Sequence, residues 1–206
     1  AEAGDIVSLA GMSKATVADT IADQSVQDPI PAQPIDPPTI TVTFGINDSP
    51  LAGRDGKKVQ SRVIRDRLLK ECESNVAIKM VDTPGGEAFD VSGRGELQMG
   101  VLIENMRREG FELSISRPRV IYKDVEGVKN EPVEEVTIDV DEEFSGAVIE
   151  KLSARKGEMV DLKSSGSGKT RIVSLVPSRG LIGYHSEFMT DTRGTGILNR
   201  VFHSWS

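Results

Sequence analysis

The sequence has few of the side chains from which disulfide and metal sites are built. Its 206 residues include one cysteine, Cys72, and two histidines, His185 and His203. A single cysteine excludes an intramolecular disulfide and a cysteine-rich zinc site, and two isolated histidines are too few for a histidine-ligated metal. We therefore expect no metal site and no bound cofactor in this chain.

Long apolar runs and a leader sequence are also missing. No run of about 18 apolar residues occurs, so the sequence predicts no membrane-spanning helix and no membrane partner. The first residues, Ala1–Asp5, lack the basic and apolar stretches of a signal peptide, and no initiator methionine precedes them. We expect a fragment or a processed form of a longer protein.

Acidic residues outnumber basic ones, 32 to 25, and the formal net charge is −7. Taken whole, this balance disfavours a nucleic-acid partner, because phosphate binding relies on Lys and Arg. The charge is uneven, however: residues 51–119 sum to +2 and residues 144–206 to +4, whereas residues 1–50 sum to −6 and residues 120–143 to −7. Aromatic residues are only 4% of the chain, so contact with RNA backbone and shape fits better than reading of single strands by stacking.

Proline marks the clearest boundary. Five of the ten prolines stand between Pro29 and Pro38, and because proline fixes φ and lacks an N–H donor, residues 26–38 are predicted to be an extended linker. Before the linker, Gly4–Gly11 alternates like a short strand that ends in a turn. Residues 1–25 are too few for a domain, and we expect them to be the end of one.

Residues 39–119 alternate strand and helix patterns. Thr39–Ile46 alternates apolar residues with threonine, which is typical of a half-buried strand. Met99, Leu102 and Met106 recur at the spacing of a helix face. The predicted elements are a strand over 39–46, a helix over 59–73, strands over 76–81 and 88–91, a helix over 96–108 and a strand over 111–115.

Residues 133–206 repeat this order after an acidic connector over 120–132. Phe144, Val148 and Leu152 stripe a helix that Gly157 closes. The predicted elements are a strand over 133–140, that helix, a hairpin of 158–163 and 170–176, a second helix marked by Leu181, Tyr184 and Phe188 and ended by Gly194, and a strand over 197–202. The fold class is therefore α+β, with two ferredoxin-like (βαββαβ) units, each an antiparallel sheet with two helices on one face.

Two stretches imitate the nucleotide site of a GTPase. Gly166–Thr170 resembles the end of a phosphate-binding loop, and Asp82–Gly85 resembles a magnesium-linked turn. The first lacks the required glycine, since position 163 is Lys163, and the two motifs stand in the wrong order. We interpret both as hairpin turns, so no nucleotide-binding motif is present.

Ser92–Glu96 stands at a helix start, where exposed N–H groups with Arg94 can hold a phosphate. The simpler interpretation is a helix cap in which Glu96 reaches back to the backbone. The residues alone favour the cap over the phosphate site.

Hydrolysis requires a nucleophile, a base and an orienting acid, and neither histidine lies in such a motif. His185 falls beside the apolar stripe of its helix and is predicted to be a structural histidine. The carboxylates Asp139, Asp141, Glu142 and Glu143 miss the spacing of a calcium loop and are predicted to be solvated. We expect no catalytic residue and no enzymatic activity in this chain.

Three longer runs are distinctive: Phe44–Gly56 (FGINDSPLAGRDG), Ser92–Gly110 (SGRGELQMGVLIENMRREG) and Pro177–Tyr184 (PSRGLIGY). Together they resemble the TypA/BipA family of translational GTPases. The resemblance implies that residues 1–25 end a β-barrel domain, and that the two ferredoxin-like units, 39–119 and 133–206, are similar to domains III and V of elongation factor G. It also implies that the GTPase domain, with its GTP and magnesium, and the family's C-terminal domain lie outside this chain.

The resemblance implies a function as well. It indicates a non-catalytic portion that docks on the ribosome and its rRNA, next to the protein's own GTPase domain, in a monomeric factor for ribosome function, large-subunit assembly and stress adaptation. The linker and Lys57–Gln60 look more like plastid than bacterial members, which favours the chloroplast stroma, with the bacterial cytoplasm as the alternative. The candidate contacts with rRNA are Arg54, Lys57, Lys58, Arg94, Arg179 and Arg193, on glycine-punctuated loops.

A second function stays open at this point. Paired ferredoxin-like units also bind small molecules between them, so a regulatory ligand-binding module is the alternative to ribosome docking. Ligand-induced thermal stabilisation favours the module, and salt-sensitive binding to rRNA favours docking.

Overall fold

A computed structural model describes all residues except 1, 13–14, 16–18, 32–34 and 165, and the chain divides into two units, Ala1–Ile35 and Asp36–Ser206. The described residues of the first unit form no helix and no strand. The strand predicted over Gly4–Gly11 is therefore wrong: Ile6 and Leu9 are exposed, and the described residues offer no partner strand for its N–H and C=O groups. The assignment of residues 1–25 to a β-barrel domain stays a prediction, and residues 32–34 of the predicted linker lie outside the described residues.

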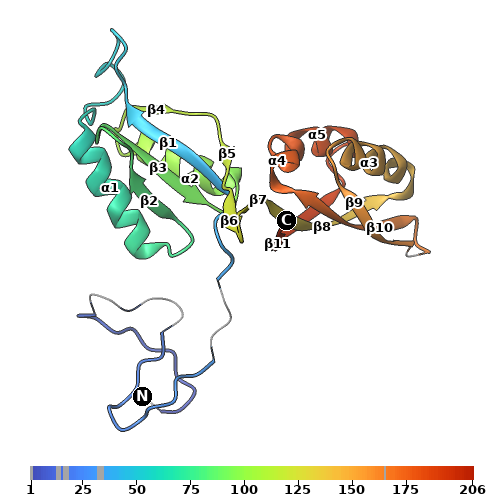
Figure 1. Ribbon diagram of the computed structural model, residues 1–206, viewed down its shortest axis with the longest axis horizontal. Helices are drawn as coiled ribbons and strands as arrows, with labels where there is room; N and C mark the ends of the chain where they lie inside the picture. The colour runs from blue at the N-terminus through green and yellow to red at the C-terminus, as the bar shows by residue number, and fades with distance from the viewer. Residues whose placement is uncertain (1, 13–14, 16–18, 32–34, 165) are drawn as a thin grey trace. The chain divides into compact units, whose positions relative to one another are not determined.

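The first ferredoxin-like half of the second unit contains four main strands and two helices (Figure 1). In chain order these are β1 (Ile40–Ile46), α1 (Ser61–Ser74), β2 (Lys79–Asp82), β3 (Ala88–Gly93), α2 (Glu96–Arg108) and β4 (Leu113–Ile115). The sheet order is β2-β3-β1-β4, and every pair is antiparallel. A short strand, β5 (Arg119–Val120), also pairs with β1.

The core of this half lies between the sheet and its two helices. Alternate residues of β1, Ile40, Val42 and Phe44, point inward and are buried, because successive side chains of a strand face opposite sides. They pack in one cluster with Leu68 of α1 and Met106 of α2. The other face of β1 is polar, with threonines that bond to β3.

The second half has the sheet order β11-β8-β10-β9, again antiparallel throughout. Its elements are β8 (Pro132–Asp141), α3 (Glu142–Ala154), β9 (Glu158–Ser164), β10 (Lys169–Pro177), α4 (Ser178–Leu181), α5 (Tyr184–Asp191) and β11 (Ile197–Trp205). Val136, Ile138 and Ile172 of the sheet are fully buried against Val148 and Phe188 of the helices. The predicted α+β class with ferredoxin-like units is confirmed.

The second helix of this half is broken, contrary to the single helix predicted up to Gly194. α4 ends at Leu181 and α5 begins at Tyr184, because Gly183 adopts a left-handed conformation with φ 73°. That conformation is common only for glycine and interrupts the helical hydrogen bonds.

The acidic connector also contains structure that was not predicted. β6 (Lys123–Val125) and β7 (Val128–Asn130) form a hairpin whose two turn residues, Glu126 and Gly127, both have positive φ. Positive φ at both positions is characteristic of the tight turn that suits the twist of a hairpin. After it, Glu131 exchanges two backbone hydrogen bonds with Ser206, which ties the connector to the end of β11.

Candidate nucleic-acid interface

The loop between β1 and α1 is folded around one carboxylate. Glu112 Oε1 accepts hydrogen bonds from the backbone N–H groups of Asp55 (2.6 Å) and Gly56 (2.8 Å). Its Oε2 accepts from the Gly53 N–H (2.7 Å) and from the Asn47 side-chain amide (3.1 Å). Four donors from one loop therefore converge on a single side chain that lies more than fifty residues away in sequence.

These donors lower the pKa of Glu112 to about 2, since each hydrogen bond stabilises the charged form. Gly56 is required for the close approach, because a Cβ there would lie 2.6 Å from the Gly110 carbonyl oxygen. Gly53 adopts a positive φ of 83°, which allows the sharp turn. The loop is thus folded inward through its backbone and leaves its charged side chains outside.

Three candidate cations lie together on this loop. Arg54, Lys57 and Lys58 are all exposed. Lys58 Nζ lies 4.6 Å from the centre of the Phe111 ring, and the Lys58 N–H donates to the Gly110 carbonyl (3.1 Å). The structure therefore brings these three together on a backbone held in one conformation.

Replacing Glu112 with glutamine should loosen this loop at every pH. In the native chain the pKa of Glu112 is lowered by folding, so its stabilisation is complete above the ordinary value of 4.5 and is lost as the pH falls through about 2. We expect the amide NMR shifts of Gly53, Asp55 and Gly56 in the folded chain to be constant from pH 7 to below 4.5 and to move only as the pH approaches about 2. In Glu112→Gln the shifts should differ already at pH 7. Identical shifts in the two proteins would contradict this role of Glu112.

Arg94 does not lie with this group. In the antiparallel pair β1–β3, Ile40 is opposite Gly93 and Gly45 is opposite Ala88. The loop follows the Ile46 end of β1, whereas Arg94 follows the Gly93 end of β3. The two sets are therefore at opposite ends of the first sheet, separated by a strand whose seven residues span about 20 Å.

The second half separates its two candidates in the same way. Pro177 of β10 is opposite Val133, so Arg179 lies at the start of β8. Ile197 of β11 is opposite Asp139, so Arg193, shortly before β11, lies at the other end of that sheet.

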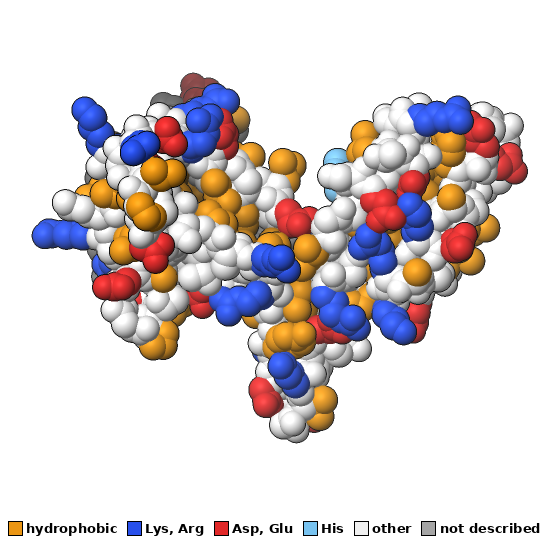
Figure 2. All heavy atoms as spheres, turned by 90° about the horizontal axis from the view of Figure 1, so that it is seen from above, with side chains coloured by type: hydrophobic (Ala, Val, Ile, Leu, Met, Phe, Trp, Pro, Cys, Tyr) orange, Lys and Arg blue, Asp and Glu red, His pale blue; other side chains and the backbone are white. Residues whose placement is uncertain are grey.

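The contacts of these three arginines differ. Arg94 Nε donates to the Asp36 carbonyl (3.3 Å), and Arg179 forms an ion pair with Glu131 (2.7 Å). The Arg193 guanidinium lies 5.7 Å from the centre of the Phe144 ring, and its backbone has a positive φ of 50°. Figure 2 shows Lys and Arg in separate groups with Asp and Glu among them, not as one continuous basic face on the side in view. The candidate interface is therefore a set of local basic sites.

Two predictions about the remaining polar residues are wrong. Glu96 does not reach back to its own helix start; its Oε2 accepts from the Gly183 N–H (2.9 Å), and Gln98 Oε1 accepts from the Arg94 N–H instead (2.8 Å). Gln98 is the third residue of α2, the position from which a side chain reaches the preceding backbone most easily. His185 is exposed and lines a cleft between α2 and the second half, so the prediction of a structural histidine is wrong.

The motifs that imitate a GTPase are hairpin turns, as predicted. Gly166 and Gly168, both with positive φ, lie between β9 and β10, and the Thr83 N–H donates to the Ala88 carbonyl (3.0 Å) between β2 and β3. Of the four carboxylates that miss the calcium-loop spacing, Asp139 pairs with Arg171 and Asp141 with Lys169, and Glu142 and Glu143 are exposed. Within the described ranges no group of three or more His, Cys, Asp or Glu is arranged to hold a metal ion, and no described helix is long and apolar enough to cross a membrane.

Comparison with known proteins identifies the family. The model of the elongation factor G C-terminus matches residues 128–206. The large ribosomal subunit assembly factor BipA of Bacillus subtilis (strain 168) is 51% identical over 205 residues, which are 100% of this chain and 34% of that protein. The BipA proteins of Haemophilus influenzae and Escherichia coli (strain K12) are 51% and 50% identical over 202 residues, 98% of this chain and 33% of each relative. The chain belongs to the TypA/BipA family.

Membership confirms the resemblance drawn from the three sequence runs. The chain spans about a third of the length of these BipA relatives, which are bacterial proteins. The elongation factor G match covers β7 (Val128–Asn130) and all of the second ferredoxin-like half.

Two features of the site could not be found from the sequence. Glu112 is one acidic residue among 32 acids, and nothing in its neighbourhood marks it as the residue that holds the loop. Arg200 of β11 forms an ion pair with Glu134 of β8, and these two strands come together only in the folded sheet.

Proposed function

We propose that this chain is a non-catalytic portion of a TypA/BipA translational GTPase that docks on the ribosome through rRNA. Two observations support the proposal. The whole of this chain is similar to a segment of large ribosomal subunit assembly factors, and one loop has a fixed backbone and exposed cations. RNA phosphates are bound by positioned Arg and Lys side chains, and a fixed backbone reduces the entropy lost on binding.

The loop that Glu112 holds carries the proposal. Arg54, Lys57 and Lys58 are within five residues of one another and exposed, on a segment fixed by four hydrogen bonds. This arrangement suits adjacent phosphates of a folded RNA, because three exposed cations stand close together on one fixed segment.

The other candidates extend the proposed interface. Arg94 and Arg179 would contact rRNA or the protein's own GTPase domain, and Arg193 would contact rRNA at the far end of the second sheet. The parent protein is proposed to bind GTP and magnesium in its GTPase domain, to act as a monomer, and to serve large-subunit assembly and stress adaptation. We place it in the chloroplast stroma, with the bacterial cytoplasm as the alternative.

Reversing two charges tests the docking loop. Arg54→Glu with Lys57→Glu, introduced in the full-length protein, should weaken binding to ribosomes at least tenfold and reduce the salt dependence of binding, because two phosphate contacts and their counterion release are lost. The measurement is co-sedimentation with ribosomes over a range of salt concentrations.

The matched control makes the same change of charge elsewhere in the same half. Arg62→Glu with Lys70→Glu alters two exposed cations of α1 that lie outside the loop, and binding should remain within about twofold. Equal sedimentation of the loop variant and the native protein would refute the assignment.

A further inference from the structure

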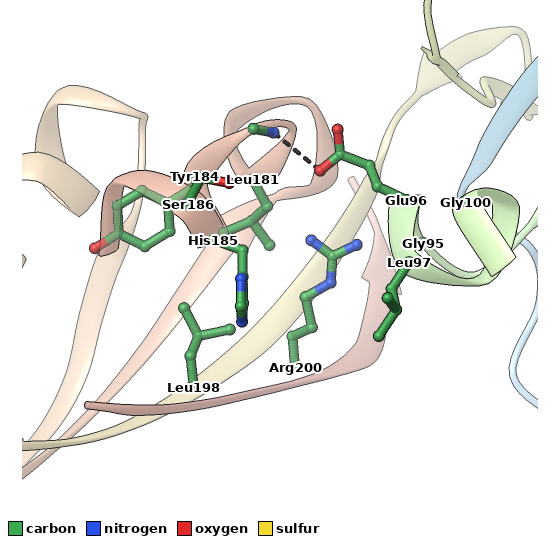
Figure 3. A pocket seen from close by; sticks show the side chains of 11 residues that line it. Gly95, Glu96, Leu97, Gly100, Leu181, Tyr184, His185, Ser186, Leu198 and Arg200 are labelled. Atoms are coloured by element: carbon green, nitrogen blue, oxygen red, sulfur yellow. Dashed lines mark hydrogen bonds between the residues drawn. The ribbon is translucent and has the colours of Figure 1, made fainter. Parts of the chain in front are cut away.

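A cleft of about 600 Å³ opens between the two ferredoxin-like halves of the second unit (Figure 3). α2 of the first half contributes Glu96 and Leu97, and the second half contributes Leu181, His185, Leu198 and Arg200. The volume lies within the range of about 300–1,000 Å³ that is usual for sites of small organic ligands, which are common at interfaces between domains. The cleft shares no residue with the basic loop, so it is a separate feature.

Arg200 is held so that its guanidinium points into the cleft (Figure 3). Arg200 Nε lies 3.2 Å from Oε2 of Glu134, and Glu134 is buried and also accepts from the Ser178 hydroxyl (2.6 Å). Gly95 makes room on the other side, since a Cβ there would lie 2.8 Å from Arg200 Nη2. A guanidinium fixed through Nε keeps its terminal nitrogens for an anion.

Glu96 provides an acceptor on the opposite wall. Its Oε2 takes the Gly183 N–H, and within the described part of the chain no residue bonds to its Oε1. The cleft therefore presents a positive group on one side and a carboxylate oxygen on the other. An occupant must match both, with an anion toward Arg200 and a hydrogen-bond donor toward Glu96.

The walls between these charges are apolar. Leu97, on α2, is 82% exposed and presents apolar surface to the cleft. In Figure 3 the exposed imidazole of His185 and Leu198 lie on the other side of the cleft, and the Arg200 side chain stands between them and Leu97. Leucine and imidazole together suit a flat ring, because the imidazole stacks and the leucine covers apolar surface.

We propose that this cleft binds a nucleoside monophosphate unit. The phosphate would contact Arg200, the base would pack against Leu97 and His185 beside the Arg200 side chain, and an exocyclic amine of the base would donate to Glu96. A simple aromatic acid would satisfy Arg200 but leave the Glu96 oxygen facing an apolar edge. The unit has two possible sources, a free nucleotide or one unpaired nucleotide of an RNA. The proposal stands on the cleft alone and does not require the docking loop.

In the first test the 206-residue chain is titrated with AMP, CMP, GMP and UMP, and the affinity of each is measured by isothermal titration calorimetry. Uracil has no exocyclic amine, so UMP should bind about tenfold more weakly than the other three. Glu96→Gln keeps an oxygen for Gly183 and turns an NH₂ toward the cleft, so it should bind UMP better than the native chain does. Native binding without preference among the four, or an unchanged preference in Glu96→Gln, would overturn the role of Glu96.

Two cleft variants are chosen because their side chains are exposed and the fold does not depend on them. Leu97→Ser and His185→Ala should each weaken AMP binding about tenfold. Val81→Ser, at a site that is 65% exposed on β2, is the matched control and should leave binding unchanged. AMP binding that is as strong in both cleft variants as in the native chain overturns the proposal. So does the absence of AMP binding by the native chain together with a negative result in the RNA test below.

The second test separates the two sources with RNA hairpins. One hairpin carries a single unpaired adenosine, one is fully paired, and one has an abasic site at the unpaired position. If the source is RNA, the first should bind at least tenfold more tightly than the other two, and Leu97→Ser should remove the difference. If the source is a free nucleotide, AMP should bind in a manner sensitive to Leu97→Ser while the three hairpins bind alike. Hairpins that bind alike and AMP binding insensitive to Leu97→Ser would refute both.

Discussion

Replacing Glu134 with alanine should lower the free energy of unfolding by about 3 kcal/mol, the cost typical of breaking a buried ion pair by removing one partner. Only 4% of the Glu134 side chain is exposed, and it accepts from the Ser178 hydroxyl and pairs with Arg200. Its loss leaves Arg200, which is 24% exposed, beside an empty space, and leaves the Ser178 hydroxyl buried without its acceptor.

The neighbouring residue is the matched control. Glu135 is on the opposite face of β8 and is exposed, so Glu135→Ala should change the free energy of unfolding by no more than about 0.5 kcal/mol. Denaturant unfolding followed by the fluorescence of Trp205, the one tryptophan of the sequence, reports on the half that contains both residues. Equal midpoints for the two variants would show that the pair contributes nothing to stability.

Gly180→Ala should destabilise the same half by about 2 kcal/mol through overpacking. A Cβ at position 180 would lie 2.5 Å from the backbone oxygen of Arg155, and a backbone atom moves less readily than a side chain. The clash falls where α4 meets the end of α3, and there Arg155 Nη1 donates to the Gly180 carbonyl (2.7 Å). The variant should therefore disturb this hydrogen bond as well.

A second glycine provides a control of opposite sign. Gly146 is an exposed residue within α3, and a Cβ there meets no atom within 4 Å. Gly146→Ala should therefore stabilise the protein by about 0.5–1 kcal/mol, because alanine has the higher helix propensity. Thermal unfolding of both variants checks the pair of predictions. Destabilisation by Gly146→Ala, or none by Gly180→Ala, would contradict them.

The fold was predictable wherever one short-range pattern decided the outcome. Alternation at Ile40, Val42 and Phe44 identifies a strand because every second side chain enters the core. The spacing of Met99, Leu102 and Met106 identifies α2 for the same reason, at helical period. Such patterns need no knowledge of distant residues.

Two elements were missed because one backbone position overrides the pattern around it. Apolar spacing continues through Leu181, Tyr184 and Phe188, yet the left-handed Gly183 divides the segment into α4 and α5. In the connector, acidic composition concealed a hairpin whose only local signal is the pair Glu126–Gly127 at its turn.

The site was predictable only in part. The cations of the loop are visible in the sequence as charges near glycines, but the residue that organises them is not. Glu112 acts through backbone donors on a segment 56 to 59 residues away at Gly53, Asp55 and Gly56. Backbone donors have no side-chain signature, so no local pattern records the contact.

The separation of the basic sites along the strands has a consequence for attachment. Arg54 and Lys57 follow one end of the first sheet, while Arg193 lies at the end of the second sheet beside Asp139. Sites with no common partner contribute independently to the free energy of binding. In the proposed docking, binding at one site would give the linked sites a high effective concentration near the same RNA, so the whole chain would gain avidity from contacts that are individually weak. Under this proposal each site would exchange its phosphate while the others held the protein in place.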